Sequence, residues 1–364
     1  MVRDDGRYVD GSVWFFDPNK IAPIVLAAIF GASGLVHAWQ CYQYKCWKLT
    51  GWAVAGALVY AASLVARVMG AGDYKNLTIY VVHFNLVYAA PPLFEMVNYC
   101  ILARVTYYLP YHSPIHPGRL KTTLTSLATI IEILGGYGAY YTSKRDEPRT
   151  EQNIGRGVLA ASLFMQIIVI AAYLALAALF HVRSRRSRGP RTRSGTSPVL
   201  WTLYVSSVLI FARTVFRLVE FFGFDSFRPF DNDGNAITIA DPSSVPAVVR
   251  FEWPFYAFDA GVLLLNLLIL HVSHPRRYLP QGRSVYLAQD GVTELEGPGF
   301  KDDRNICVII MDPLDFIGMI KGTNKATRFW EMNGFSERSS AEIRGEHALG
   351  DEPTRVRHEG RRKR

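Results

Sequence analysis

Residues 21–44 read IAPIVLAAIFGASGLVHAWQCYQY and contain no Asp, Glu, Lys or Arg. At a rise of about 1.5 Å per residue, a helix of about 20 apolar residues crosses the hydrocarbon core of a bilayer. The preceding segment is acidic, with Asp4, Asp10 and Asp17, and does not have the basic start of a cleaved signal peptide. The stretch therefore predicts a first transmembrane helix that itself directs membrane insertion.

Six further segments downstream have the same apolar character, so the sequence predicts seven transmembrane helices. They cover residues 49–70, 76–104, 121–143, 155–182, 199–223 and 250–271. Pro91 and Pro92 predict a kink in the third. Hydrophobic residues make up 49% of the chain and charged residues 20%, a balance that excludes a disordered chain and most soluble folds. We expect an all-α integral membrane protein whose seven-helix bundle spans residues 21–275.

Lys and Arg in the short loops set the predicted orientation, because positively charged loops stay in the cytosol. Six arginines lie between residues 183 and 193, which places the C-terminus in the cytosol and the N-terminus outside. Residues 1–20 then form an extracytoplasmic segment and residues 276–364 a cytosolic polar tail that we expect to be largely disordered. We expect loop 183–193 to contact anionic lipid and expect no nucleic-acid partner, because the basic residues stand beside apolar segments.

The sequence predicts no metal, cofactor or catalytic residue. The four cysteines form no Cys-x-x-Cys pair, which argues against a zinc site and a disulfide framework. The spacings His112-x-x-x-His116 and His271-x-x-His274 are isolated pairs, whereas a membrane metal enzyme needs three or more convergent ligands. A lipid-modifying enzyme is therefore the weakest of the functional interpretations.

Ionisable residues inside the last two predicted spans follow helical spacing. Each one costs roughly 2.5–3.5 kcal/mol on insertion scales, so it needs a partner, water or a function. In the sixth span Arg213, Arg217 and Glu220 stand at i, i+4 and i+7, which places them on one helix face. The seventh span repeats the pattern with Glu252, Tyr256 and Asp259. The two spans therefore carry complementary charged faces.

The depth of these residues predicts how they pair. A rise of about 1.5 Å per residue places Arg213 and Asp259 at one level, roughly 15 Å below the outer surface. The same count sets Arg217 and Glu220 against Glu252, nearer to that surface. An antiparallel pair of helices can then satisfy these charges in two acid–base rungs.

Further polar side chains predict a chamber in the outer half of the bundle: Arg67, His83, Asn85 and Gln166, with Glu132 near the middle. One interpretation is a pocket, open to the outside, for a zwitterionic or cationic headgroup. The other is a buried ionic clamp that fixes the helix register and meets no ligand. Both remain open on the sequence alone.

Charged residues at other depths lead to two more expectations. Arg67 and Arg104 stand close to span ends, where long basic side chains can extend to the membrane surface, and we expect them to do so. Glu95 and Glu132 have no evident partner in the pattern, which favours a functional role for both.

Three motifs in the last spans are specific: LIFARTVFRLVE at 209–220, EWPFYAFD at 252–259, and His274-Pro275. The chain resembles the fungal lipid-translocating exporter family, named for resistance to aminocholesterol, which carries an Arg-x-x-x-Arg-x-x-Glu helix, a Glu-x-x-x-Tyr-x-x-Asp helix and a closing His-Pro. The resemblance covers about residues 20–280. Where the family's second span carries an acid, this chain has Tyr60; a glutamine of the third span falls on His83, and one of the fourth span on Glu132.

The resemblance implies a seven-helix protein linked to outward movement of, or resistance to, sphingoid bases, sterol analogues or porphyrins. An exporter of such amphipathic lipids or toxicants is the leading hypothesis: Asp259, Glu252 and Glu132 attract an amine, while Arg213 and Arg217 hold those acids or a phosphate. The rival is a seven-helix receptor or sensor that binds the same ligand without moving it. The plasma membrane is the favoured location, with the endoplasmic reticulum and the vacuole as alternatives.

Overall fold

The computed structural model describes residues 8–9, 12–144, 148–185, 190–225, 245–297, 299, 304–312, 315–321, 328–331 and 337–338. The long loop between the sixth and seventh spans therefore falls largely outside the described residues. So do the central part of loop 183–193 and the chain after residue 338.

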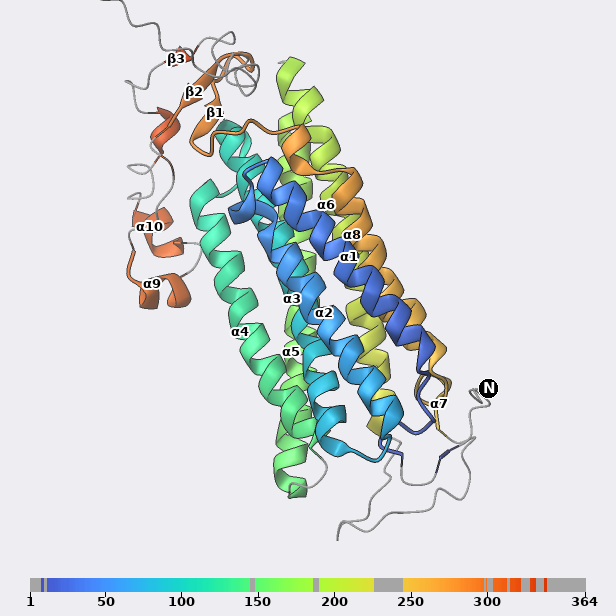
Figure 1. Ribbon diagram of the computed structural model, residues 1–364. Coiled ribbons are helices and arrows are strands. Elements are labelled where there is room, and N and C mark those ends of the chain that lie inside the picture. The colour runs from blue at the N-terminus through green and yellow to red at the C-terminus, as the bar shows by residue number, and fades with distance from the viewer. Residues whose placement is uncertain are drawn as a thin grey trace, which may run out of the picture.

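Seven long helical segments of the described chain form an elongated bundle, as Figure 1 shows. The first six are α1 (Ile21–Gln43), α2 (Trp47–Gly72), α3 (Leu77–Tyr108), α4 (Pro117–Ser143), α5 (Arg149–Arg185) and α6 (Pro190–Asp225). The seventh begins as a π-helix, η3 (Phe255–Gly261), and continues as α8 (Val262–Val272). The predicted helical membrane fold is confirmed.

Six of these seven described segments are long and apolar enough to cross a membrane by length and composition. The remaining one, α4, is long but does not meet the criterion for apolar composition. Its N-terminal half is rich in threonine, and its hydroxyls bond back to the helix: Thr125 Oγ1 donates to the carbonyl of Lys121 at 2.9 Å and Thr129 Oγ1 to that of Thr125 at 2.8 Å. Hydroxyls satisfied in this way let a less apolar helix lie within the bundle.

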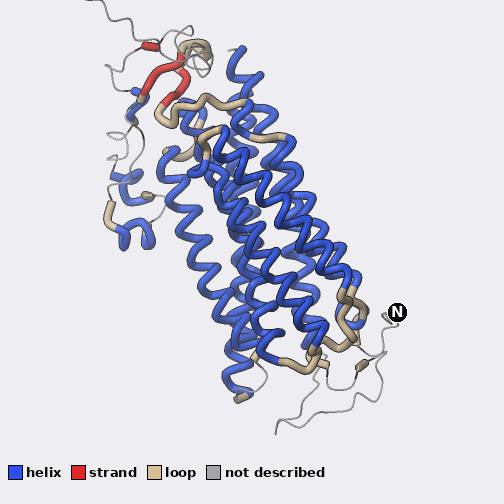
Figure 2. The backbone as a smooth tube through the Cα atoms, viewed as in Figure 1, coloured by secondary structure: helices blue, strands red, loops and turns tan. Residues whose placement is uncertain are grey.

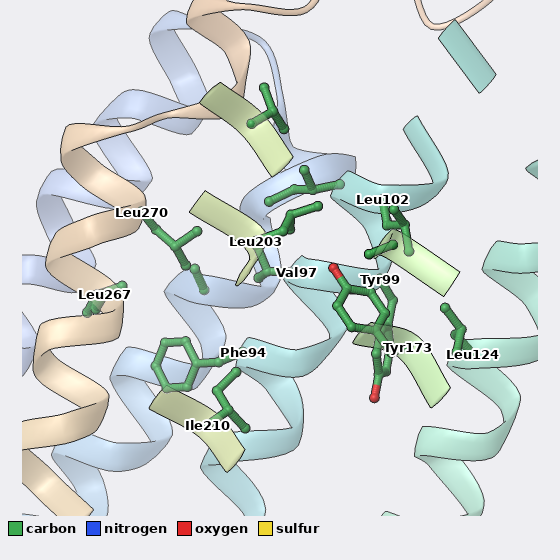
Figure 3. Packing of buried hydrophobic residues seen from close by; sticks show 14 of the residues in the cluster. Phe94, Val97, Tyr99, Leu102, Leu124, Tyr173, Leu203, Ile210, Leu267 and Leu270 are labelled. Carbon is green, nitrogen blue, oxygen red and sulfur yellow. The ribbon is translucent and has the colours of Figure 1, made fainter. Parts of the chain in front are cut away.

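The core of the bundle surrounds α3, which packs against α2, α4 and α6. Nearly every side chain from Val97 to Tyr108 is buried. Figure 3 shows the packing at this level, where Phe94 and Val97 of α3 meet Leu203 and Ile210 of α6, and Leu267 and Leu270 of α8. The polar side chains of this buried stretch, such as Asn98 and Arg104, are hydrogen-bonded to neighbouring elements.

Small residues bring α4 and α5 together. A Cβ added at Gly138 would lie 2.5 Å from the backbone nitrogen of Leu159, and one at Gly155 would lie 2.5 Å from Cβ of Tyr141. Transmembrane helices approach this closely only where side chains are absent. The glycine-rich run of α4 therefore serves helix packing.

The two ends of the bundle differ, as Figure 2 shows. One end carries the short helix α7 (Ala247–Arg250) and residues 12–20, and we name it the α7 end. The other carries the antiparallel strands β1 (Val285–Leu287), β2 (Glu294–Glu296) and β3 (Glu337–Arg338), and we name it the sheet end. The short helices α9 (Ile306–Met311) and α10 (Phe316–Lys321) follow β2 in the chain, and α9 packs on α4.

The expectation of a largely disordered tail is wrong for residues 276–297. The guanidinium of Arg104 donates to the carbonyls of Gly282 (2.7 Å) and Val285 (3.2 Å), and Tyr108 donates to Glu294 at 2.8 Å. Arg104 is thus buried under the tail rather than extended to the surface. Apolar side chains of this segment, such as Leu287, join the main core, which supplies the stabilisation that the polar composition does not indicate.

Candidate functional site

Asp259 is the centre of the ionic network and is fully buried. Its Oδ1 accepts from Nε of Arg213 at 2.5 Å and from Nε of Arg217 at 3.0 Å. Its Oδ2 accepts from Nη2 of Arg217 at 2.7 Å and from the hydroxyl of Tyr60 at 2.6 Å. The predicted pairing of Arg213 with Asp259 at one depth is present. Two arginines and a phenol together satisfy one carboxylate.

The backbone around Asp259 is π-helical, which is uncommon and occurs mostly as a single wide turn at functional sites. The π-helix begins directly after Pro254, which lacks the amide proton that a longer preceding α-helix would need. The wide turn changes the direction in which Asp259 leaves the helix compared with an α-helical residue. This turn allows its carboxylate to lie between both arginines of α6.

Arg213 also compensates for one of the two prolines inside α3. Pro91 has no N–H, so the carbonyl of Val87, four residues earlier, lacks its usual helical donor. Nη2 of Arg213 donates to that carbonyl at 2.9 Å. Because no water supplies this bond in a bilayer core, a neighbouring helix must do so. One guanidinium therefore joins α6 to both α3 and η3.

Glu252 has different partners from those expected. Its Oε1 accepts from Arg67, with Nη2 at 2.7 Å and Nε at 3.1 Å, and from the hydroxyl of Tyr256 at 2.7 Å. Arg217 instead pairs with Glu220 of its own helix, besides Asp259. The predicted second rung is therefore wrong, because Glu252 precedes the helical segment and the depth count holds only within a helix.

Arg67 is buried, with 3% of its surface exposed, so the expectation that it extends to the membrane surface is also wrong. Its guanidinium carbon lies 4.8 Å from the ring centroid of Trp14 and 4.3 Å from that of Phe255. Its Nη1 lies 3.2 Å from Nε2 of His83, whose Nδ1 lies 2.8 Å from the carbonyl of Ser63. Since a carbonyl only accepts, we assign the proton to Nδ1, and Nε2 then accepts from Arg67.

Residues 12–19 cover this cluster at the α7 end. The backbone N–H of Asn19 donates to Oε2 of Glu252 at 2.8 Å, and the N–H of Val13 donates to the carbonyl of Tyr74 at 3.2 Å. A cavity of about 40 Å³ remains beneath them, lined in part by Trp14 and Arg67. This space accommodates water but not a lipid headgroup. The described residues therefore leave only a small cavity where the sequence predicted an open chamber.

A second polar group lies deeper, between α3 and α5. Glu95 is 5% exposed and accepts from Nε2 of Gln166 and from the hydroxyl of Tyr99 at 3.0 Å. The expectation that Glu95 has no partner is thus wrong, and Gln166 belongs to this group rather than to the Asp259 network. Glu132 on α4 is half-buried and forms no hydrogen bond or ion pair with another described residue.

Sequence reasoning missed Tyr60 and Trp14 as members of the site. Tyr60 lies seven residues, or about two helical turns, before Arg67 on α2. This spacing places both side chains on one helix face and could have indicated that Tyr60 belongs to the site. Trp14 precedes the first span and offered no signal. Asn85, by contrast, only bonds the carbonyl of Val81 on its own helix, at 2.9 Å, and does not join the site.

Two histidines, His37 of α1 and His271 of α8, lie close together at the sheet end. Nδ1 of His37 lies 3.3 Å from Nδ1 of His271, whose Nε2 lies 2.8 Å from the hydroxyl of Ser33. His271 is thus not an isolated histidine. In the part of the chain that the structure describes, no group of three or more His, Cys, Asp or Glu side chains is arranged to hold a metal ion.

A bundle with several membrane-spanning helices and buried ion pairs defines an integral, multi-pass membrane protein. The chain carries an RTA1-like domain: the family model described as RTA1 like protein matches residues 53–232. It is 35% identical, over 87% of its length, to a lipid-translocating exporter-like protein RTA1 of Leptosphaeria maculans, and spans 61% of that relative.

Two more distant relatives extend the comparison. A lipid-translocating exporter-like protein RTA1 of Ajellomyces capsulatus is 26% identical over 70% of this chain and 77% of its own length. Protoporphyrin uptake protein 1 of Saccharomyces cerevisiae is 25% identical over 64% of this chain and 72% of its own. No solved structure matches the chain. The relatives' names describe membrane transport.

Proposed function

We propose that the protein is a membrane transporter that exports amphipathic lipids or lipid-like toxicants, such as sphingoid bases and sterol analogues, and so contributes to resistance. The observation that carries the proposal is the closed ionic network at the α7 end, which residues 12–19 cover. The names of two relatives refer to lipid translocation, which agrees with an amphipathic cargo.

Glu252 is the residue that we propose receives the headgroup. It lies directly beneath residues 12–19 and accepts from Arg67, Tyr256 and the backbone of Asn19. A cationic headgroup can take the place of the Asn19 N–H and of Arg67, so that binding and displacement of the covering segment become one event. The new ion pair keeps the Glu252 carboxylate paired, whereas the displaced Arg67 keeps only its contacts with His83, Trp14 and Phe255 and needs another acceptor or water once the site opens.

Asp259 has a different proposed role, because it is deeper and is held by two arginines and Tyr60. It fixes Arg213 and Arg217 at mid-bundle, where the guanidinium groups can meet a phosphate-bearing or hydroxyl-bearing headgroup once the site is open. In this proposal, an amine that moves between α3 and α5 meets the carboxylate of Glu95, which is bonded to Gln166, and that of Glu132 on α4.

The proposed orientation places the α7 end outside the cell and the sheet end in the cytosol, with the plasma membrane as the location. The argument is the concentration of arginines at residues 183–193, around the junction of α5 and α6, since such basic segments stay in the cytosol. Export then means release toward the end at which residues 12–19 cover the network.

A sensor that binds the lipid without moving it is the second candidate, favoured by the docked tail. Arg104 and Tyr108 on α3 hold residues 282–294, so a movement of α3 would reach the tail directly. A sensor predicts ligand binding without flux, whereas a transporter predicts flux.

The test is flux of a fluorescent sphingoid base out of proteoliposomes that contain the full chain. We expect Glu252→Gln to reduce flux at least about tenfold, because a neutral amide loses the attraction for an amine. Glu151→Gln is the matched control, since Glu151 is an exposed acid in the first turn of α5 outside the network. Both variants are compared at equal folded amounts by size-exclusion profile.

Wild-type flux equal to that of empty liposomes would reject transport of this substrate. Binding of the same lipid without flux would instead support the sensor. Equal flux in Glu252→Gln and the wild type would keep a transporter but remove Glu252 from its proposed role.

A further inference from the structure

A second, larger cavity lies at the sheet end. Its volume is about 340 Å³, and it lies between the start of α2, the end of α3 and the start of α4, with Arg276 and Arg283 of the tail also lining it. Leu49 and Ala103 contribute an apolar wall. A cavity of this size accommodates a small polar group of several heavy atoms rather than a single water molecule.

The charged residues that line this cavity are all cationic: Lys45, Lys48, Arg104, Lys121, Arg276 and Arg283. Among the described lining residues there is no Asp or Glu, and none of these six cations forms an ion pair with a carboxylate of the described chain. Like charges gathered around a cavity repel one another and attract an anion. The described lining therefore leaves the positive charge around this cavity unbalanced.

Arg104 gives the most specific indication of a ligand. Its side chain is 92% buried, since 8% is exposed, and both terminal nitrogens donate to neutral backbone carbonyls. Its Nε is buried and has no hydrogen-bond partner among the described residues. A buried guanidinium nitrogen without an acceptor is costly. An anion in the cavity that Arg104 lines would add negative charge beside this guanidinium, next to the more distant carboxylate of Glu294.

We propose that this cavity binds the phosphorylated headgroup of an anionic lipid from the leaflet at the sheet end. A phosphate monoester carries close to two negative charges and several acceptor oxygens, which suit a combination of Arg forks and Lys ammonium groups. The apolar wall at Leu49 and Ala103 suits the glycerol part of a lipid better than it suits a free ion. Basic pockets between helices on the cytoplasmic side are known sites for such headgroups.

The experiment measures binding of a fluorescent phosphatidylinositol 4-phosphate to the full chain in phosphatidylcholine nanodiscs by anisotropy. The triple variant Lys45→Gln, Lys48→Gln, Lys121→Gln removes three exposed charges without touching Arg104 or the core. We expect its Kd to rise at least about tenfold, since each basic residue near the headgroup contributes severalfold.

The matched control is Arg277→Gln, Lys321→Gln, Arg328→Gln. It removes the same number of basic charges, all from residues that follow the seventh helix and do not line the cavity. We expect its Kd to stay within about twofold of the wild type. An equal loss in both triple variants would show general surface attraction and overturn the proposal, as would an unchanged Kd in the first.

Two further arms identify the source of the phosphate. Phosphatidylserine nanodiscs that compete as well as phosphatidylinositol 4-phosphate would show that no phosphate monoester is recognised. Inorganic phosphate or soluble inositol phosphate that displaces the lipid at comparable concentration would show a site for a soluble anion. Either result would overturn the lipid assignment, whereas weak competition by both supports it.

Discussion

The two ends of this bundle both hold buried arginines, but their charges are balanced differently. At the α7 end three arginines face three acids: Arg67, Arg213 and Arg217, with Glu220, Glu252 and Asp259. At the sheet end six cations surround a cavity of about 340 Å³ and the described lining contains no acid. The first arrangement is complete by itself and leaves a cavity of about 40 Å³. In the second, the described lining supplies no carboxylate to balance the cations.

The balance of charge around a buried group indicates whether that group has a structural role or binds a ligand. A buried charge whose partners are all in the chain contributes to fold and register, and it binds a ligand only by exchanging partners. A buried charge whose hydrogen bonds to the described residues go only to neutral carbonyls, as those of Arg104 do, is stabilised further by an anion that reaches it. Removing a charge should therefore have opposite consequences for stability at the two ends.

The largest expected effect is at the α7 end, in Asp259→Asn. The amide leaves Arg213 and Arg217 without their shared carboxylate inside the bundle, so we expect a loss of about 3–5 kcal/mol of stability. Thermal unfolding of purified protein in one detergent measures it. Asp290→Asn, at an exposed turn of the tail, is the matched control. Equal unfolding temperatures of Asp259→Asn and wild type would contradict a structural network.

A smaller loss is expected for Tyr60→Phe. This change removes only the hydroxyl that donates to Oδ2 of Asp259 at 2.6 Å and leaves the ring packed against Phe30. A hydrogen bond to a charged acceptor is worth about 1.5–3 kcal/mol. Tyr42→Phe is the control, because Tyr42 is 76% exposed on α1. If the two variants unfolded alike, the Tyr60 hydroxyl would have no part in holding Asp259.

At the sheet end, removing charges should leave the stability unchanged or raise it, instead of lowering it. The variant Lys45→Gln, Lys48→Gln, Lys121→Gln relieves repulsion around an empty cavity, so without anionic lipid we expect its stability to equal or exceed that of the wild type by less than about 1 kcal/mol. The measurement is the same unfolding assay in a neutral detergent. A clear loss of stability would mean that these lysines make intramolecular contacts that matter, which would weaken the contrast.

The smallest effect is that of salt. Raising ionic strength to about 0.5 M shortens the screening length to a few ångströms and weakens repulsion between exposed charges. We expect the wild type in neutral detergent to gain a few tenths of a kcal/mol, and the lysine triple variant to gain less. Buried pairs such as Arg213–Asp259 are screened little, so the loss in Asp259→Asn should not change with salt. A salt-dependent loss there would place the network in contact with solvent.

The membrane class, the seven helices and the pairing of Arg213 with Asp259 could all be predicted from local sequence pattern. Hydropathy and helical spacing are local properties, and a fixed rise per residue converts position along a helix into depth. That conversion fails where the chain is not regular. Glu252 lies outside the helix and Asp259 in a π-helical turn, so the second predicted rung was wrong although the residues were the right ones to consider.

Which distant side chains are in contact could be read only from the packed bundle. Arg67 and Glu252 are 185 residues apart, Tyr60 and Asp259 199, and Glu95 and Gln166 71. Composition shows that such charges need partners, but the choice depends on which helices are neighbours and how they are rotated. The docking of residues 276–297 and the cationic cavity arise in the same way, since they combine α2, α3, α4 and the tail. Local pattern fixes depth and face, whereas contact between elements requires the packed bundle.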